Sequence, residues 1–260
     1  MSLEEIFSCR GKVALVTGAA SGLGFMFAEA MAEAGADVAC ADIDMDGLSD
    51  TMRTVEALGR KAIAIRCNVA DEEQVKRMVA DTVKAFGTID ILFNNAGIGP
   101  RPCPVHELAT EDWGKVIDVD LNGAFYCARE VLKVMVPRRS GKIINIASVW
   151  GVTGSSSTWP SPAYNAAKGA LVNLTREMGL CYAPHGINVN AICPGFIKTN
   201  IGGGQGPDRA EFQEKTSQWI PMGRIGMPQE LKGLAILLAS GASSYMCGDI
   251  IMVDGGIVAK

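Results

Sequence analysis

Short apolar runs alternate along the chain with longer segments whose apolar residues recur every three or four positions. Turn-forming residues bound each short run, which therefore has the length of a buried strand, whereas the longer spacing is that of a helix. Helices are predicted over several segments, including 22–34, 72–86, 111–136 and 163–183. Strands are predicted over residues 13–16, 38–41, 62–67, 89–93, 142–147, 188–193 and 250–253.

Alternating strands and helices predict an α/β fold in which helices cover both faces of a seven-stranded parallel sheet. The chain has 260 residues, of which 48% are hydrophobic, so it is long enough to bury one large core. Because no Pro/Gly/Ser-rich linker divides the sequence, we expect residues 1–260 to form a single domain.

Composition excludes several classes of protein. The net charge is -4 and no basic stripe is visible, which argues against a nucleic-acid partner. The chain shows no secretory signal, and the aliphatic stretch 234–239 is too short to span a bilayer, so we expect a cytoplasmic protein with no membrane partner. Eight scattered cysteines without a Cys-x-x-Cys motif, and only two histidines, predict no metal site.

A glycine-rich loop, residues 17–24, follows the first predicted strand directly and opens the first long helix. This is the context in which a helix start binds the diphosphate of a dinucleotide, since backbone N–H groups and the helix dipole favour an anion there. The spacing is Gly-x-x-x-Gly-x-Gly, and the fold it predicts is of the Rossmann type. The candidate contacts are Gly18, Ser21, Gly22, Leu23 and Gly24.

Asp42 follows the second predicted strand, where a carboxylate can accept hydrogen bonds from the adenosine ribose. A 2′-phosphate about 4 Å away would be repelled by roughly 4 kcal/mol at an effective dielectric constant near 20. The neighbouring positions Ala20, Ser21 and Ile43 offer no cation. The sequence therefore predicts NAD as the cofactor, with Asp42 and Ile43 beside its ribose.

Tyr164 and Lys168 are four positions apart on a predicted helix, so the ammonium and the phenol share one face. Ser148 follows the predicted strand 142–147 and stands sixteen residues before Tyr164, where its hydroxyl can hold a substrate oxygen. This trio predicts tyrosine-based proton transfer, because a nearby cation favours the phenolate.

The glycine loop, Asn94-Asn95-Ala96-Gly97, a serine, Tyr164-x-x-x-Lys168 and Pro194-Gly195 occur in the order that is typical of the short-chain dehydrogenase/reductases, and the chain resembles that family over nearly its whole length. The resemblance implies that Tyr164 and Lys168 also contact the cofactor. It implies further cofactor contacts from Asn68, Val69, Asn95, Ala96, Gly97, Pro194, Gly195, Ile197 and Thr199.

The mechanism that the resemblance implies makes Tyr164 the proton acceptor while hydride leaves the same carbon for nicotinamide. A phenol normally titrates near 10, and lowering its pKa to about 7 requires roughly 4 kcal/mol. Lys168 and the oxidised ring are expected to supply it. The family's fourth catalytic position, usually Asn, falls on Asp120, which could preserve a relay to Lys168 through its main-chain carbonyl. Alternatively, Asp120 is only hydrogen-bonded locally.

Two segments, 149–163 and 200–222, are expected to close over a substrate, and both carry tryptophan. Arg101 and His106 could meet an anionic group of the substrate or could be solvated. We expect a secondary alcohol: a polyol, a hydroxy acid or a cyclic alcohol. The rivals are a ketone reductase of the 3-oxoacyl carrier-protein type and a non-catalytic NAD-binding sensor. The resemblance also implies a homotetramer.

Overall fold

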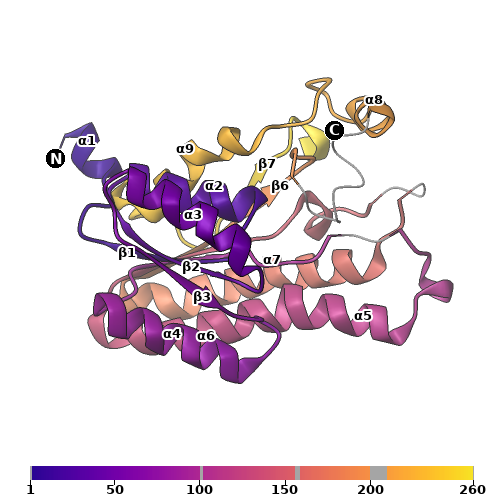
Figure 1. Ribbon diagram of the computed structural model, residues 1–260. Helices are drawn as coiled ribbons and strands as arrows, with labels where there is room; N and C mark the ends of the chain where they lie inside the picture. The colour runs from indigo at the N-terminus through magenta and orange to yellow at the C-terminus, as the bar shows by residue number, and fades with distance from the viewer. Residues whose placement is uncertain (1, 100–101, 156–158, 200–209, 260) are drawn as a thin grey trace.

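The computed structural model describes residues 2–99, 102–155, 159–199 and 210–259 (Figure 1). Its centre is a parallel sheet of seven strands in the order β3-β2-β1-β4-β5-β6-β7. The predicted α/β fold of the Rossmann type is thus confirmed. The strands are β1 (Val13–Thr17), β2 (Asp37–Asp42), β3 (Ala62–Arg66), β4 (Ile91–Asn94), β5 (Gly141–Ile146), β6 (Ile187–Pro194) and β7 (Ile250–Val253).

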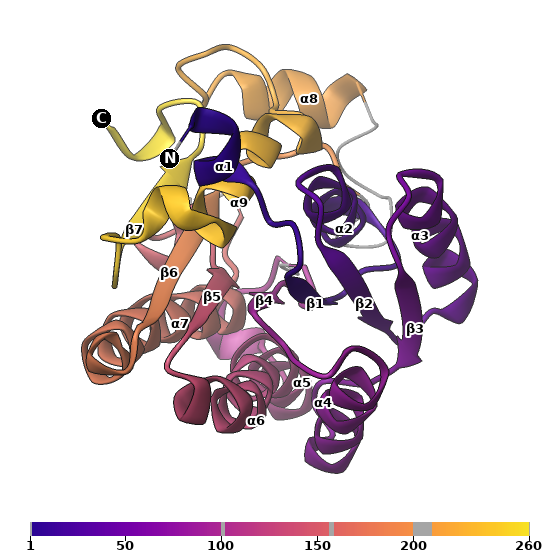
Figure 2. The same ribbon diagram turned by 90° about the vertical axis from the view of Figure 1, so that its left-hand side faces the viewer.

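Helices cover both faces of the sheet (Figure 2). One face is packed by α2, α3 and α9, and the other by α4, α6 and α7. The described helices are α1 (Leu3–Phe7), α2 (Gly22–Glu33), α3 (Met45–Ala57), α4 (Glu72–Phe86), α5 (Thr110–Ile117), α6 (Gly123–Arg138), α7 (Pro162–Tyr182), α8 (Ala210–Ser217) and α9 (Lys232–Ala239). Among the described residues, no helix is long and apolar enough to cross a membrane.

The segment 111–136 is helical throughout, as predicted, but it is not one regular helix. The segment forms α5 and α6, and a π-helical turn, Asp118–Asn122, joins them. Such a turn inserts one residue into the helical repeat and is frequent at functional sites. It gives Asp120 a buried side chain, 1% exposed, in an otherwise amphipathic helix. The apolar spacing did not indicate this turn.

The sheet reverses its strand order between β1 and β4, since β3 and β2 lie to one side of β1 whereas β4 to β7 lie to the other. In doubly wound sheets a ligand binds at such a switch point, outside the carboxyl ends of the strands. Phe27 of α2 stacks on Phe93 of β4 under this point, with ring centroids 4.8 Å apart. The core therefore fixes α2 against the two strands that border the predicted cofactor site.

Candidate active site

The glycine loop connects β1 to α2 by close backbone contacts that only glycine allows. Gly18 has a φ of +67°, and a Cβ there would lie 2.9 Å from the Cα of Ala96. A Cβ on Gly24 would collide with the carbonyl oxygen of Gly18. The first turn of α2 thus packs directly on the loop, which leaves its N-terminus open toward the carboxyl edge of the sheet.

Side chains of the two strands at the switch point hold this loop in place. Asn95 donates from Nδ2 to the carbonyl oxygens of Thr17, at 2.9 Å, and Gly18, at 3.2 Å. The buried Oγ1 of Thr17 accepts hydrogen bonds from the backbone N–H groups of Asn95 and Ala96, at 3.0 and 3.1 Å. Asn95 and Ala96 therefore lie against the loop, as expected, and Asn95 has a loop-bracing role that its sequence motif did not reveal.

Asp42 lies at the carboxyl end of β2 and faces the glycine loop. Its Oδ2 accepts a hydrogen bond from the backbone N–H of Ala20 at 3.0 Å, and its Oδ1 accepts one from the backbone N–H of Asp44 at 3.1 Å. These bonds fix the carboxylate beside the start of α2. The neighbouring Ile43 is 63% exposed, so its side chain is available to a ligand at this edge.

One cation near Asp42 was missed in the sequence. Arg66 ends β3 and is the register partner of Asp42 across the two parallel strands, so both side chains leave the same face of the sheet. Within the described chain Arg66 forms no ion pair with Asp42. Strand pairing therefore places an arginine opposite Asp42 in the sheet, a neighbour that the positions adjacent in sequence did not reveal.

Ser148, Tyr164 and Lys168 come together as predicted. Ser148 follows β5, and its side chain forms a hydrogen bond with Tyr164, which is carried by the first turn of α7. The Nζ of Lys168, one turn further along α7, lies 5.5 Å from the centroid of the Tyr164 ring and donates to the carbonyl oxygen of Ile146 at 3.0 Å. All three catalytic candidates are buried, with 4–8% of each residue exposed.

Asp120 also joins this cluster, through its side chain. Its Oδ2 lies 3.2 Å from the Nζ of Lys168, and its Oδ1 accepts a hydrogen bond from the backbone N–H of Ile98 at 2.8 Å. A Cβ on Gly97 would lie 3.0 Å from Oδ2 and 3.4 Å from Nζ, so a larger residue at Gly97 would press on the ion pair. The sequence had suggested a relay through the main-chain carbonyl of Asp120 or a local hydrogen bond; the structure shows in addition a direct carboxylate–ammonium contact with Lys168.

The charges of this cluster oppose one another. Burial raises the pKa of Asp120, although Lys168 acts against it. Burial is the largest influence on Lys168 and by itself would lower its pKa, but Asp120 and Tyr164 together with Cys193 outweigh it, so the pKa is raised. For Tyr164, burial is the main reason that the pKa is raised; Lys168 and Ser148 lower it, and Asp120 raises it further.

In the protein chain alone, Lys168 therefore does not bring the pKa of the Tyr164 phenol toward neutrality; the expectation for Lys168 together with the oxidised nicotinamide ring stays a prediction. Desolvation disfavours the phenolate, and the Asp120 carboxylate offsets part of the charge that Lys168 contributes. A positive charge from a bound oxidised nicotinamide is needed to reverse this balance.

The remaining predicted cofactor residues lie along the same edge. Thr199 meets the glycine loop, because a Cβ on Gly22 would be 3.4 Å from the Cβ of Thr199. Pro194 ends β6, and a Cβ on Gly195 would lie 2.8 Å from the Cα of Asp254, so Gly195 is also a close-approach position. Asn68 and Val69 follow the end of β3, and Ile197 follows the end of β6.

The predicted substrate segments are only partly within the described chain. Residues 156–158 and 200–209, and Arg101, lie outside it. The Nε2 of His106 lies 3.4 Å from the Oε1 of Glu107, and the His106 side chain is 79% exposed. Trp150 packs edge-on against Tyr164 and against Phe196, with centroid separations of 6.3 and 5.7 Å. An aromatic wall therefore supports the tyrosine, which the sequence showed only as a tryptophan on a loop.

Comparisons with known proteins agree with this geometry. The family model described as enoyl-(acyl carrier protein) reductase matches residues 18–258. The 3-oxoacyl-[acyl-carrier-protein] reductase of Thermotoga maritima is 38% identical, over 95% of this chain and 98% of the relative.

Two solved structures have almost the same fold. A short-chain type dehydrogenase/reductase from Mycobacterium marinum superposes with a TM-score of 0.94 at 36% identity, and all of both chains is covered. A gluconate 5-dehydrogenase from Burkholderia cenocepacia, in complex with NADP and tartrate, superposes with a TM-score of 0.92 at 35% identity over all of both chains.

The fold and the site define an oxidoreductase that uses a nicotinamide cofactor. The chain belongs to the short-chain dehydrogenase/reductase family.

Proposed function

We propose that the protein oxidises a secondary alcohol to a ketone with NAD, and that Tyr164 accepts the hydroxyl proton. The observation that carries this proposal is the buried cluster of Ser148, Tyr164, Lys168 and Asp120. It lies at the carboxyl edge of the sheet, beyond the strands that also hold the glycine loop. A protein that only senses the dinucleotide has no need of such a proton-transferring group.

Each side chain has a separate task. The Ser148 hydroxyl holds the substrate oxygen next to Tyr164, whose Oη takes the proton. Lys168 places its ammonium near the phenol and stabilises the phenolate that is the active base. Asp120 and the carbonyl oxygen of Ile146 hold that ammonium in position. When bound, oxidised nicotinamide supplies the hydride acceptor and a positive charge.

We propose NAD as the preferred cofactor because the Asp42 carboxylate is fixed beside the start of α2, where it would repel the 2′-phosphate of NADP. A solved relative carries NADP, and Arg66 next to Asp42 is a specific observation in favour of that cofactor. The Asp42 carboxylate would repel a 2′-phosphate, whereas the Arg66 guanidinium would attract it. The carboxylate is anchored by two backbone N–H groups, and at 4 Å its Coulomb repulsion of a phosphate would favour NAD by roughly 4 kcal/mol.

The substrate we propose is a polyol, a hydroxy acid or a cyclic alcohol. The gluconate 5-dehydrogenase among the structural neighbours acts on a hydroxy acid, whereas the 3-oxoacyl reductase relative supports the rival direction, ketone reduction. Trp150 and Phe196 form an apolar wall beside Tyr164, and Ser148 provides the polar contact. This mixture suits a moderately polar alcohol.

We also propose a homotetramer. The edge strand β7 is only half-buried in the single chain, with apolar side chains along its length, and an unpaired edge of this kind favours association. Size-exclusion chromatography with light scattering measures the mass directly. A mass of about one chain would contradict this part of the proposal.

A panel of secondary alcohols tests the function. Gluconate, sorbitol and a hydroxycyclohexane carboxylate are each offered with NAD and with NADP, and reduced cofactor is followed by its absorbance. Reduction of NAD with at least one alcohol supports the proposal. If only 3-oxoacyl substrates with NADPH turn over, the protein is a reductase. Tight NAD binding without turnover in either direction would indicate a sensor.

A further inference from the structure

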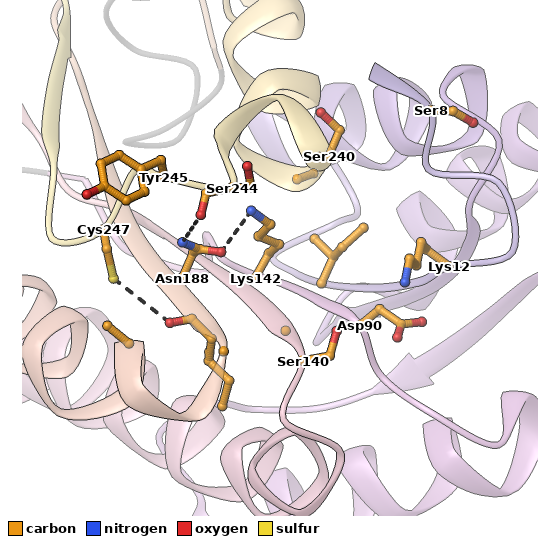
Figure 3. A pocket seen from close by; sticks show the side chains of 17 residues that line it. Ser8, Lys12, Asp90, Ser140, Lys142, Asn188, Ser240, Ser244, Tyr245 and Cys247 are labelled. Carbon is orange, nitrogen blue, oxygen red and sulfur yellow. Dashed lines mark hydrogen bonds between the residues drawn. The ribbon is translucent and has the colours of Figure 1, made fainter. Parts of the chain in front are cut away.

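A second cavity lies at the opposite edge of the sheet from the catalytic cluster, around the amino-terminal ends of β5 and β6. Its volume is about 560 Å³, which is within the usual range for small-molecule sites. Figure 3 shows side chains from the start of β1, from β4 to β6 and from the turn before β7 surrounding it. The polar residues that line it include Ser8, Lys12, Asp90, Ser140, Lys142, Asn188, Ser240, Ser244 and Tyr245.

Lys142 provides an ammonium group in this cavity that has only neutral partners. Its Nζ donates to the Oδ1 of Asn188 at 2.9 Å and to the Oγ of Ser243 at 3.1 Å. Within the described part of the chain no carboxylate lies within ion-pair distance of it. Burial lowers the pKa of Lys142 to about 8.

The cavity contains ammonium and hydroxyl donors that a ligand could use. An ammonium group has three N–H donors, and Lys142 uses two of them on protein atoms. Lys12 adds a second, exposed ammonium group at the rim. The hydroxyl groups of Ser140 and Ser244, which also line the cavity, form no hydrogen bond to other described residues.

The carboxylate in the cavity is already neutralised. Asp90 accepts hydrogen bonds from the Nη2 of Arg138 at 2.6 Å and from the backbone N–H of Val13 at 3.0 Å. Arg138 therefore balances its charge, and among the described residues no ion pair joins Asp90 to Lys142 or Lys12, so the two lysines make the cavity cationic. Tyr245, fully exposed at the rim, offers an aromatic surface to the part of a ligand that extends beyond its anionic group.

We propose that this cavity binds the phosphate group of a small molecule, held by Lys142, Lys12 and the hydroxyls of Ser140 and Ser244. Phosphate matches these donors because it presents several acceptor oxygens. Its negative charge would also balance the positive charges of the two lysines. The volume exceeds that of phosphate alone and leaves room for an organic portion next to Tyr245. The site does not depend on the dinucleotide or on Tyr164.

Calorimetric titration of the full chain at constant ionic strength tests the proposal. Inorganic phosphate is used in one arm and glycerol 3-phosphate in the other. We expect saturable binding of one equivalent, weakened at least tenfold by Lys142→Met and severalfold by Lys12→Met. Lys84→Met removes the same charge from an exposed position at the end of α4 and leaves the affinity unchanged.

Two comparisons complete the test. Tighter binding of glycerol 3-phosphate than of inorganic phosphate assigns the site to an organic phosphate, and equal binding assigns it to the free anion. Lys12→Met decides the matter if Lys142→Met does not fold, because Lys12 is exposed. The proposal is overturned if the unaltered protein shows no saturable binding, if both cavity variants bind as it does, or if Lys84→Met weakens binding equally. Phosphate bound at the glycine loop would persist in every variant and is thereby distinguished.

Discussion

The Oδ2 atom of Asp120 lies 3.2 Å from the Nζ atom of Lys168, and both side chains are almost completely buried. The cation that stabilises the Tyr164 phenolate is therefore shared with a carboxylate. In a buried cluster such a carboxylate holds the ammonium in place and keeps it protonated, but it also opposes ionisation of the phenol. The ion pair thus fixes Lys168 beside Tyr164, but the Asp120 carboxylate raises the pKa of the Tyr164 phenol.

Asp120→Asn tests this opposition by its effect on pH dependence. Alcohol oxidation rises with pH as Tyr164 loses its proton, and the Asp120 charge raises the pKa of that phenol. Removing the charge lowers the pKa, so the rising part of the kcat/KM profile moves to lower pH, by about one unit. The profile is measured from pH 6 to 11 with saturating NAD.

The control for this experiment is Asp118→Asn, which removes an exposed carboxylate from the same π-helical turn. Its profile is expected to match that of the unaltered protein. A profile of Asp120→Asn that stays in place, or moves to higher pH, would show that the Asp120 charge does not act on the base.

Cofactor preference is tested at Asp42. Asp42→Ala removes the repulsion from a 2′-phosphate and exposes that phosphate to Arg66, so kcat/KM with NADP is expected to rise relative to NAD by about 100-fold or more. Asp42→Ala combined with Arg66→Met is expected to lose part of this gain. If the unaltered protein already uses both cofactors with comparable kcat/KM, the assignment of NAD is refuted.

Trp150 is expected to position Tyr164. Its edge contacts with Tyr164 and Phe196 leave little room for the phenol to move. Trp150→Ala opens this wall, and a displaced base is expected to reduce kcat by about 10- to 100-fold with little change in the dissociation constant of NAD. Trp150→Phe retains an aromatic edge and is expected to keep most of the activity. Equal kcat in all three proteins would exclude a positioning role.

The stacked pair Phe27 and Phe93 is expected to dominate stability at the switch point. Both rings are completely buried. Phe27→Ala removes the ring and leaves a cavity, which is expected to cost about 3–5 kcal/mol in the free energy of unfolding. Phe27→Leu keeps most of the volume and is expected to cost less. Chemical denaturation measures both, and a cost below about 1 kcal/mol for Phe27→Ala would contradict this account of the core.

The sequence allowed the sheet and much of the site to be predicted, because these depend on local patterns. Buried parallel strands appear as apolar runs, and the glycine loop and Tyr164-x-x-x-Lys168 act over a few residues. Helix α3 was not among the helices named in advance; its buried residues are Leu48, Thr51 and Val55. Its start is fixed by the side chain of Asp44, which caps the backbone N–H groups of the first turn.

What the sequence did not reveal depends on contacts between distant segments. Strand pairing makes Arg66 the register partner of Asp42, and the direct contact of Asp120 with Lys168 joins a π-helical turn to helix α7. The raised pKa of Tyr164 follows from burial, which spacing does not indicate. The cavity at Lys142 is assembled from strand ends and turns far apart in the chain.

Tyr164→Phe tests the central claim most directly, because it removes one oxygen atom from a ring that stays packed against Trp150. NAD binding by calorimetry and turnover of the best alcohol in the panel are measured on the same preparation. We expect turnover to be abolished and the dissociation constant of NAD to change little. Undiminished turnover by Tyr164→Phe would contradict the assignment of this tyrosine as the base.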